Sequence, residues 1–220
     1  MNISVKNILH IVDMQNSFTN KKGALFIKNA DLLINKINLY LKDIKKDDYS
    51  SIIYTQDTHF IDEYPLQQES KEFPIHCIYN SFDWNLSIDI NNVNKDIEIF
   101  RLFKNQFDCF AKSNLNINNI KNEYDKSTYK KLGIVENHKS NEKYNNILEF
   151  LQQYPPQNTT ITIIGVALDY CVKYAIDGYL SLNYKVKILK DLNVGIHKQN
   201  NDFFNQQYYQ KYIKNNLLIV

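Results

Sequence analysis

Hydrophobic and polar positions along the chain predict strands that alternate with helices. Short apolar runs rich in β-branched residues recur, as is typical of strands buried on both faces. Between the first two runs, apolar residues follow helical spacing over a length that a crossover connection needs. Strands are expected at residues 8–12, 51–55, 97–102, 160–166, 185–189 and 216–220, and helices at residues 30–41, 145–152, 171–182 and 202–213.

This alternation predicts an α/β fold: a mostly parallel, doubly wound sheet with helices on both faces. Such sheets bind ligands beyond the carboxyl ends of their strands. Asp13, Asp57 and Cys171 each follow an expected strand, so their side chains are expected to converge at that edge. The length of 220 residues suits a single domain spanning residues 1–220. Residues 112–143 are polar and rich in Asn, Lys and Tyr, and are expected to form an inserted surface loop.

Composition narrows the class of partner. With 26 Lys and Arg against 24 Asp and Glu, the net charge of +2 gives no electrostatic case for binding nucleic acid or an anionic membrane. A small-molecule partner is therefore expected. No apolar stretch approaches the roughly 18 to 20 residues of a membrane span, and the first residues do not resemble a signal peptide. The three unevenly spaced cysteines do not describe a disulfide framework, so a cytoplasmic location is expected.

Cys171 is the most informative single residue, because it stands where an expected strand turns into a helix. A thiol in the first turn of a helix faces unpaired backbone N–H groups and the positive end of the helix dipole, and both favour the thiolate. The same N–H groups can hold an oxyanion that forms on a carbonyl attacked by the sulfur. Two interpretations stay open: a catalytic nucleophile, or an inert buried side chain.

Three further residues have the chemistry of metal ligands. Asp57 and His59 lie two positions apart at the end of a strand, so their side chains point the same way. With His76 they would supply one carboxylate and two imidazoles, which suit zinc, manganese or iron and leave positions open for water and substrate. The alternative is that both histidines are loop residues bonded to the backbone.

Asp13 and Lys104 could form a charged pair near the thiol. Asp13 ends a buried run, so its carboxylate must be paired or have a raised pKa, unless it only caps the turn that follows. Lys104 stands two residues beyond the third expected strand, where it could pair with Asp13 and stabilise a thiolate. Considered alone, it is an ordinary surface lysine.

These residues occur in a set of sequence blocks whose order resembles the nicotinamidase branch of the isochorismatase-like cysteine hydrolases. The resemblance spans roughly residues 7–195, and the combination of blocks in register is more specific than any one of them. The blocks are Val12-Asp-Met-Gln-Asn-Ser-Phe18, Gln56-Asp-Thr-His59, Pro74-Ile-His-Cys77, Lys104-Asn-Gln-Phe-Asp-Cys-Phe110 and Gly165-Val-Ala-Leu-Asp-Tyr-Cys-Val172.

The resemblance implies roles for individual residues. Asp13 would shuttle protons, Lys104 would be its cationic partner, and Cys171 would be the nucleophile. The family has a cis peptide that would fall here between Val166 and Ala167, and it would aim the N–H of Ala167, with that of Cys171, into an oxyanion hole. Asp169 is expected to cap the helix that follows. The family's metal ligands match Asp57, His59 and His76, and the aromatic residues that flank its substrate match Phe18, Phe73 and Tyr170.

The reaction implied is hydrolysis of nicotinamide to nicotinic acid and ammonia, as in NAD salvage, with a divalent metal positioning the pyridine nitrogen. Zinc is the metal expected first, with manganese or iron as alternatives, and a homo-oligomer is left open. The sequence departs from the family after the Asp-x-His pair, where many members have another histidine. Glu63 or solvent is expected to take its place.

Three other interpretations compete with this one. An isochorismatase cleaves a vinyl ether without a nucleophilic cysteine, so Cys171 argues against it. An N-carbamoyl amide hydrolase would keep the cysteine but does not need the Asp57, His59 and His76 set. A non-enzymatic metal-binding or thiol redox protein would leave Asp13 and Lys104 unexplained.

Overall fold

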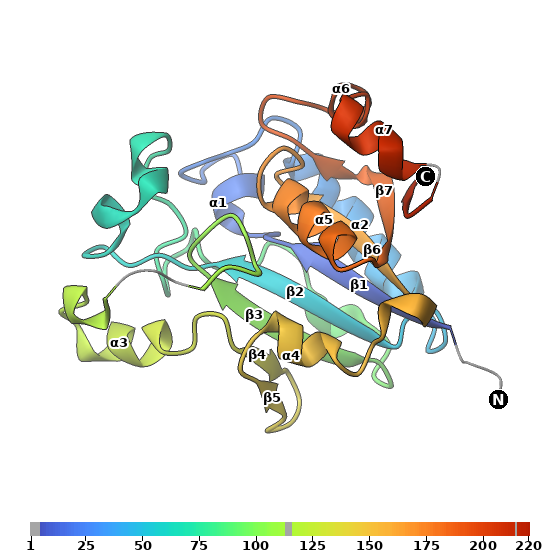
Figure 1. Ribbon diagram of the computed structural model, residues 1–220. Coiled ribbons are helices and arrows are strands. Elements are labelled where there is room, and N and C mark those ends of the chain that lie inside the picture. Colours follow the sequence, from blue (N-terminus) through green and yellow to red (C-terminus); the bar gives the residue numbers. More distant parts are fainter. Residues whose placement is uncertain (1–4, 113–115, 214) are drawn as a thin grey trace.

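A sheet of eight strands runs through the centre of the molecule, in the order β5-β4-β3-β2-β1-β6-β7-β8 (Figure 1). The structure is a computed structural model that describes residues 5–112, 116–213 and 215–220. The strands are β1 (Lys6–Val12), β2 (Ser51–Asp57), β3 (Glu98–Lys104), β4 (Val135–Asn137), β5 (Lys143–Tyr144), β6 (Thr159–Val166), β7 (Lys185–Val194) and β8 (Leu217–Ile219).

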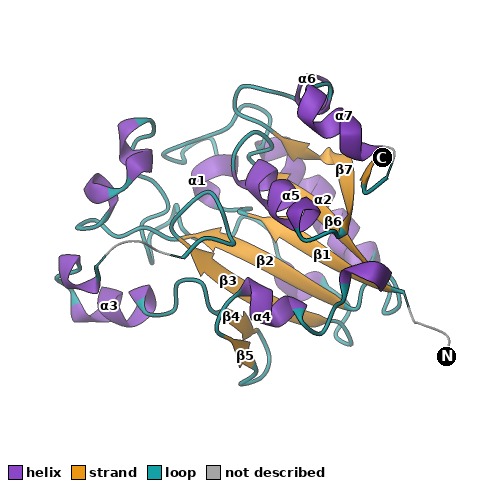
Figure 2. Ribbon diagram, viewed as in Figure 1, coloured by secondary structure: helices purple, strands orange, loops and turns teal. Residues whose placement is uncertain are grey.

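The sheet is parallel from β3 to β8 and antiparallel only where β4 and β5 extend it beyond β3. This confirms the α/β class and the mostly parallel sheet expected from the sequence. Helices cover both faces, with α2 on one side and α4 and α5 on the other (Figures 1 and 2). The helices are α1 (Asn16–Thr19), α2 (Asp31–Asp43), α3 (Glu123–Tyr129), α4 (Ile147–Leu151), α5 (Cys171–Ser181), α6 (Asn200–Phe204) and α7 (Gln207–Ile213).

The alternation of side chains along the strands creates two hydrophobic cores. On β1, Ile8 and Val12 face the core beneath α4 and α5, whereas Leu9 and Ile11 face the core beneath α2. Residues on successive strand positions are therefore buried on opposite faces. This double burial explains why the strands appear in the sequence as continuous apolar runs.

Two of the expected strands are longer than their apolar runs. β2 continues through Asp57 and β3 through Lys104, and these two residues are register partners in neighbouring strands. Both polar side chains therefore stand on the last positions of strands, at the carboxyl edge of the sheet.

The helix expected over residues 202–213 is wrong as a single element, because the structure has two helices there, α6 and α7. Phe203, Phe204 and Tyr209 are all buried, and their rings contact one another. At 100° per residue, one straight helix would point these three side chains in widely different directions. The break between the helices lets all three rings pack together.

Residues 112–143, expected as a surface loop, contain regular structure. The stretch holds the 3₁₀ turn η4 (Ile117–Asn119), α3, β4 and the first residue of β5, while residues 113–115 lie outside the described part. A three-residue strand such as β4 is too short to show a periodic pattern, and only Val135 of it is buried. Further 3₁₀ turns are η1 (Tyr64–Leu66), η2 (Gln68–Lys71), η3 (Ile90–Asn92) and η5 (Pro156–Asn158).

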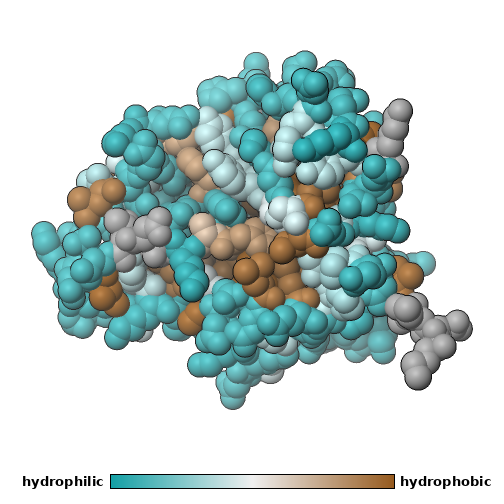
Figure 3. Space-filling model, viewed as in Figure 1, coloured by the Kyte–Doolittle hydropathy of each residue, from teal (hydrophilic) through white to brown (hydrophobic). Residues whose placement is uncertain are grey.

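The face shown in Figure 3 is largely hydrophilic, with hydrophobic side chains gathered between α5 and α4. Leu148 of α4 is among the exposed hydrophobic residues, at 48% exposure. Over the part of the chain that the structure describes, no helix combines the length and the hydrophobicity needed to cross a lipid bilayer. The residues 1–4, which bear on the expectation about a signal peptide, lie outside that part.

Candidate active site

Asp13, Lys104 and Cys171 come together at the carboxyl edge of the sheet. Asp13 directly follows β1, Lys104 ends β3, and Cys171 begins α5 after β6. The Lys104 ammonium lies 2.8 Å from Asp13 Oδ2 and 3.4 Å from Cys171 Sγ. All three side chains are buried, with exposures of 0%, 5% and 7% in chain order. Groups more than 60 residues apart in sequence thus share one enclosed site.

Thr55 fixes the orientation of the Asp13 carboxylate. Its hydroxyl donates to Asp13 Oδ1 at 2.7 Å and accepts the Asp13 backbone N–H at 3.2 Å. Asp13 has φ of 47°, in the left-handed region that Asp tolerates better than most residues. This turn at the end of β1 leaves Oδ2 directed at Lys104.

Opposing effects determine the charge state of the site. Burial alone would lower the pKa of Lys104, but the carboxylates of Asp13 and Asp57 raise it well above its usual value, so the ammonium stays charged. Burial raises the pKa of Cys171, Asp13 and Asp57 raise it further, and Lys104 only partly opposes them. The start of the helix is therefore not enough to make a thiolate in the free site, because burial and two carboxylates raise the pKa of the thiol. A base must take its proton before the sulfur can attack.

The peptide between Val166 and Ala167 is cis, as the resemblance implied. Leu168, Tyr170 and Val172 donate their backbone N–H groups to neighbouring carbonyls. No described residue accepts a backbone hydrogen bond from Ala167 or Cys171 at this corner. These two N–H groups are therefore available to an oxyanion beside the sulfur.

Asp169 has a different role from the one expected. The residue before α5 is Tyr170, and no side chain caps this helix. The Asp169 carboxylate instead accepts the backbone N–H groups of Ile196, His197 and Lys198 at 2.6 to 2.8 Å. It thereby ties the loop after β7 to the corner that carries Cys171.

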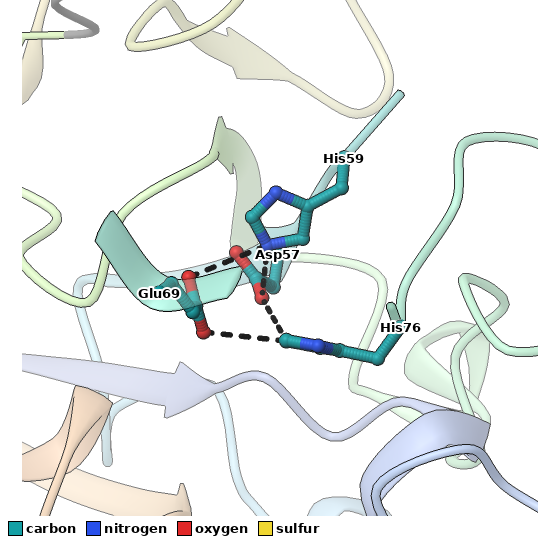
Figure 4. Close-up of side chains that lie close together, drawn as sticks. All are labelled: Asp57, His59, Glu69 and His76. Atoms are coloured by element: carbon teal, nitrogen blue, oxygen red, sulfur yellow. Dashed lines mark hydrogen bonds and ion pairs between the residues drawn. The ribbon is translucent and has the colours of Figure 1, made fainter. Parts of the chain in front are cut away.

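Four buried side chains next to this site form a group that can hold a divalent metal: Asp57, His59, Glu69 and His76 (Figure 4). One ligand atom from each lies within 4.8 Å of the others. Asp57 Oδ2 is 3.1 Å from His59 Nε2 and 3.2 Å from His76 Nε2. Glu69 completes the ring at 3.5 Å from His59 Nε2 and 3.3 Å from His76 Nε2. Two imidazoles and two carboxylates at this spacing match the ligand preferences of zinc and similar cations.

Glu69 occupies the position for which Glu63 or solvent was expected. Glu63 lies behind His59, with Oε2 3.8 Å from His59 Nδ1, and its Oε1 accepts a hydrogen bond from Asn105 at 2.7 Å. His76 is held in a similar way, because its Nδ1 is 2.8 Å from the carbonyl of Pro74. The outer nitrogen of each imidazole thus faces an oxygen atom, at hydrogen-bond distance for His76 and at 3.8 Å for His59, and Nε2 of each ring faces inward.

The charges of this group suit a cation. Burial alone would lower the pKa of both histidines, but the surrounding carboxylates raise it to about 10 for His59 and about 9 for His76. The carboxylates thus attract positive charge to both nitrogens, and a bound metal would replace the protons. Lys104 joins this group to the thiol site, since its ammonium is also 3.4 Å from Asp57 Oδ1.

A small cavity of about 20 Å³ lies between the thiol and the four-ligand group. The three aromatic residues expected to flank a substrate, Phe18, Phe73 and Tyr170, all line it, as do Cys171 and Ala167. Five residues at its wall were not predicted as site residues: Leu25, Ile27, Glu69, Phe107 and Ile196. Phe107 belongs to the Lys104 block, but nothing in the spacing singles it out, and Glu69 lies in a Gln-rich stretch without a recognisable motif.

Comparison with known proteins places this site in a family context. No protein-family profile matches the sequence. The nicotinamidase of Saccharomyces cerevisiae is 27% identical over 213 residues, covering 83% of this chain and 85% of the yeast protein.

Solved structures cover nearly the whole chain. The pyrazinamidase of Pyrococcus horikoshii, in complex with zinc, has a TM-score of 0.61 and 21% identity, and covers 98% of both chains. PnC1 of L. infantum, in complex with nicotinate, has a TM-score of 0.66 and 18% identity, and covers 100% of this chain and 99% of its own. An isochorismatase-like hydrolase of Alkaliphilus metalliredigens has a TM-score of 0.59 and 16% identity, and covers 97% of this chain and 93% of its own.

The mostly parallel sheet, with a buried cysteine at the start of α5, places the protein in the α/β class. Within that class, the fold is the one seen in the solved nicotinamidase, pyrazinamidase and isochorismatase-like hydrolase structures. Its relatives include nicotinamidases and pyrazinamidases.

Proposed function

We propose that this protein is a nicotinamidase, which hydrolyses nicotinamide to nicotinic acid and ammonia and so serves NAD salvage. The observation that carries the proposal is the position of Lys104, whose ammonium contacts both Asp13 and Cys171. A carboxylate, an ammonium and a thiol in mutual contact are suited to nucleophilic attack on a carboxamide. The 27% identity to a nicotinamidase over most of the chain supports the choice of substrate.

The first half of the reaction uses Asp13 as a base. Because the raised pKa keeps Cys171 protonated, Asp13 takes the thiol proton as sulfur attacks the amide carbon, and Lys104 stabilises the developing thiolate. The carbonyl oxygen gains the negative charge and faces the N–H groups of Ala167 and Cys171. Asp13 then gives the proton to the nitrogen, the C–N bond breaks, ammonia leaves, and a thioester of Cys171 remains.

The second half returns the enzyme to its starting state. Asp13, again ionised, takes a proton from water while the water oxygen attacks the thioester carbon. The C–S bond breaks, nicotinic acid is released, and sulfur recovers the proton from Asp13. The same carboxylate therefore acts as base and acid in both halves, which its fixed orientation by Thr55 and Lys104 allows.

The divalent metal is proposed to be zinc, held by the Asp57, His59 and His76 set together with Glu69. Bound there, the metal supplies an electron-pair acceptor for the pyridine nitrogen. Phe18, Phe73 and Tyr170 are proposed to contact the faces and edges of the ring, which places its carboxamide beside Cys171. Manganese and iron are the alternatives that the same ligands accept.

Three further expectations remain predictions: a single domain over the whole chain, a cytoplasmic location, and the possibility of a homo-oligomer. The test of the function itself is release of ammonia from nicotinamide by the purified protein. Wild-type protein and a Cys109→Ala control, which removes another buried free cysteine, are expected to release ammonia, whereas Cys171→Ala is not. Release of ammonia from an N-carbamoyl amide but not from nicotinamide would reject nicotinamide as the substrate. Release of ammonia from neither compound would reject the proposal that the protein is an amide hydrolase.

A further inference from the structure

Two cavities of very different size meet at the active site. The inner one, beside Cys171, has about 20 Å³, which is room for about one water molecule. The outer one has about 540 Å³ and is lined in part by Leu66, Lys71, Glu72, Asp108 and Tyr174. Glu69 and Phe107 belong to the walls of both. A ring that enters the inner cavity must therefore displace part of a wall shared with a large open space.

Aromatic rings from the two cavities meet at Phe107, which lines both of them. Phe73 and Tyr170 have ring centroids 5.1 Å apart, and Phe107 lies 5.2 Å from Tyr170 and 6.1 Å from Phe73. On the outer side, Tyr174 stacks on Phe107 at 6.1 Å with an angle of 16° between the ring planes. Phe107 is therefore the ring that separates the two cavities, and the others hold it in place.

A hydrogen bond holds Tyr170 against the same wall. The Tyr170 hydroxyl donates to Glu72 Oε1 at 2.5 Å, across 98 positions of sequence. Glu72 and Phe73 in turn donate their backbone N–H groups to the carbonyl of Glu69, each at 3.0 Å. The bond thus connects the residue next to the nucleophile with the turn η2 that carries Glu69.

We propose that Phe107, backed by the hydrogen bond between Tyr170 and Glu72, determines which ring sizes the site accepts. Phe107 is a specificity-determining residue, and Glu72 is a positioning residue that acts through Tyr170. Small side-chain movements admit a single unsubstituted ring, whereas a fused or bulky substituted ring needs the space that Phe107 fills. This inference rests on the proposed function, because it concerns the carboxamide substrate of the same site.

The first test compares substrates in variants at position 107. In Phe107→Ala, the ratio of kcat/KM for quinoline carboxamide to kcat/KM for nicotinamide is expected to rise at least about tenfold over wild type, since even one methylene group in a hydrophobic pocket changes kcat/KM by about 10- to 200-fold. Phe107→Leu, which keeps the core filled, is expected to give a smaller rise. Tyr208→Ala, at an exposed aromatic residue on α7, is the matched control and should leave the ratio unchanged.

The outcomes separate this inference from the function on which it rests. No hydrolysis of nicotinamide by the wild-type protein would reject the function. Hydrolysis of nicotinamide with an unchanged substrate ratio in both Phe107 variants would reject the role of Phe107 while leaving the function intact.

The second test concerns the hydrogen bond between Tyr170 and Glu72. Glu72→Ala and Tyr170→Phe both remove the hydrogen bond and are expected to raise KM for nicotinamide several-fold, with a smaller change in kcat. Glu72→Gln keeps an acceptor oxygen and should stay close to wild type. If the two residues act through one bond, the double variant Glu72→Ala with Tyr170→Phe should be no worse than either single variant. Additive effects, or a Glu72→Gln variant as impaired as Glu72→Ala, would overturn the role of Glu72.

Discussion

The two ends of the central sheet both carry polar side chains, but in opposite settings. At the amino end of the strands, a hollow of about 400 Å³ is lined by Asn7, Tyr40, Asp43, Asp48 and Lys187, among others. At the carboxyl end, the cavity beside Cys171 is only about 20 Å³. The reactive groups gather at the carboxyl end, where the small cavity adjoins the outer one of about 540 Å³, so the chemistry of the lining residues distinguishes the two ends better than cavity size does.

The polar groups at the amino end stabilise local structure. Asp48 is exposed, its carboxylate accepts the backbone N–H of Lys45 at 2.8 Å, and its carbonyl accepts the Asn7 amide at 3.2 Å. These bonds close the turn between α2 and β2. Such contacts occur in surface turns generally and require no ligand.

At the carboxyl end, by contrast, the charges are buried and face one another. Lys104 contacts Asp13 and Asp57, and the latter faces two histidines. Removing several ions from water costs free energy that their attraction only partly returns, so such a group is weak evidence for stability. The buried charges at the carboxyl end are therefore expected to serve catalysis, whereas the polar groups at the amino end serve stability.

The largest effect is expected from Cys171→Ala. The rate of ammonia release should fall by more than about 10³-fold, because no other group can form the thioester. Bound metal should stay near wild type, because the sulfur is not one of the four candidate ligands, and the midpoint of thermal unfolding should fall only slightly, because one buried sulfur atom is removed. Activity that survives this substitution would show that the carboxyl end works by another mechanism.

Asp13→Asn is expected to lower the rate by about 10²- to 10⁴-fold, the usual contribution of a general base. The same change should make the thiol more acidic, because Asp13 is one of the groups that raise the pKa of Cys171. Alkylation of Cys171 by iodoacetamide should therefore reach its half-maximal rate at a lower pH than in wild type. Cys171→Ala provides the correction for Cys77 and Cys109, and an unchanged or higher midpoint would contradict the assigned electrostatics.

Glu69→Gln and Glu63→Gln distinguish a metal ligand from a residue that orients one. Loss of the Glu63 carboxylate behind His59 is expected to weaken metal binding by about 10- to 100-fold. Loss of the Glu69 carboxylate, which faces both Nε2 atoms, should weaken it more. Elemental analysis after dialysis against graded chelator measures both, and the reverse order would place Glu63 at the metal.

The smallest effect is expected at the amino end. Asp48→Ala removes one turn-stabilising hydrogen bond and should lower the free energy of unfolding by about 0.5 to 1 kcal/mol, as measured by urea denaturation. Ammonia release should be unchanged. A large loss of activity would show that the contrast between the two ends is mistaken.

Local patterns in the sequence predicted the elements that build the site. The apolar runs fix β1, β2 and β6, and the rule for parallel sheets then brings Asp13, Asp57 and Cys171 to one edge. Lys104 was a possible partner of Asp13 from its position after the third strand, and the resemblance to a family then implied its role. Its contact with Asp57 depends on the register between β2 and β3, which no local pattern reveals.

Other features depend on distances between separate segments of the chain. Glu69 lies near His59 because the turn η2, which is close to β2 in the sequence, brings its carboxylate to the end of that strand. Phe107, in the loop after β3, contacts Tyr170 and Tyr174 at the start of α5 and so separates the two cavities. The protonated state of Cys171 follows from complete burial near two carboxylates, whereas the sequence showed only its place at a helix start. Three-dimensional proximity decides each of these cases.

The triple contact of the Lys104 ammonium has an evolutionary consequence. Because the Lys104 ammonium is the cation that pairs with Asp13, a descendant that lost Lys104 would keep the Asp13 carboxylate buried without that partner, whereas Asp57 would still face His59 and His76. Loss of one partner of this buried pair would therefore destabilise the folded protein, whether or not the protein is still catalytically active. Lineages that abandon the reaction are expected to replace Asp13 and Lys104 as a pair.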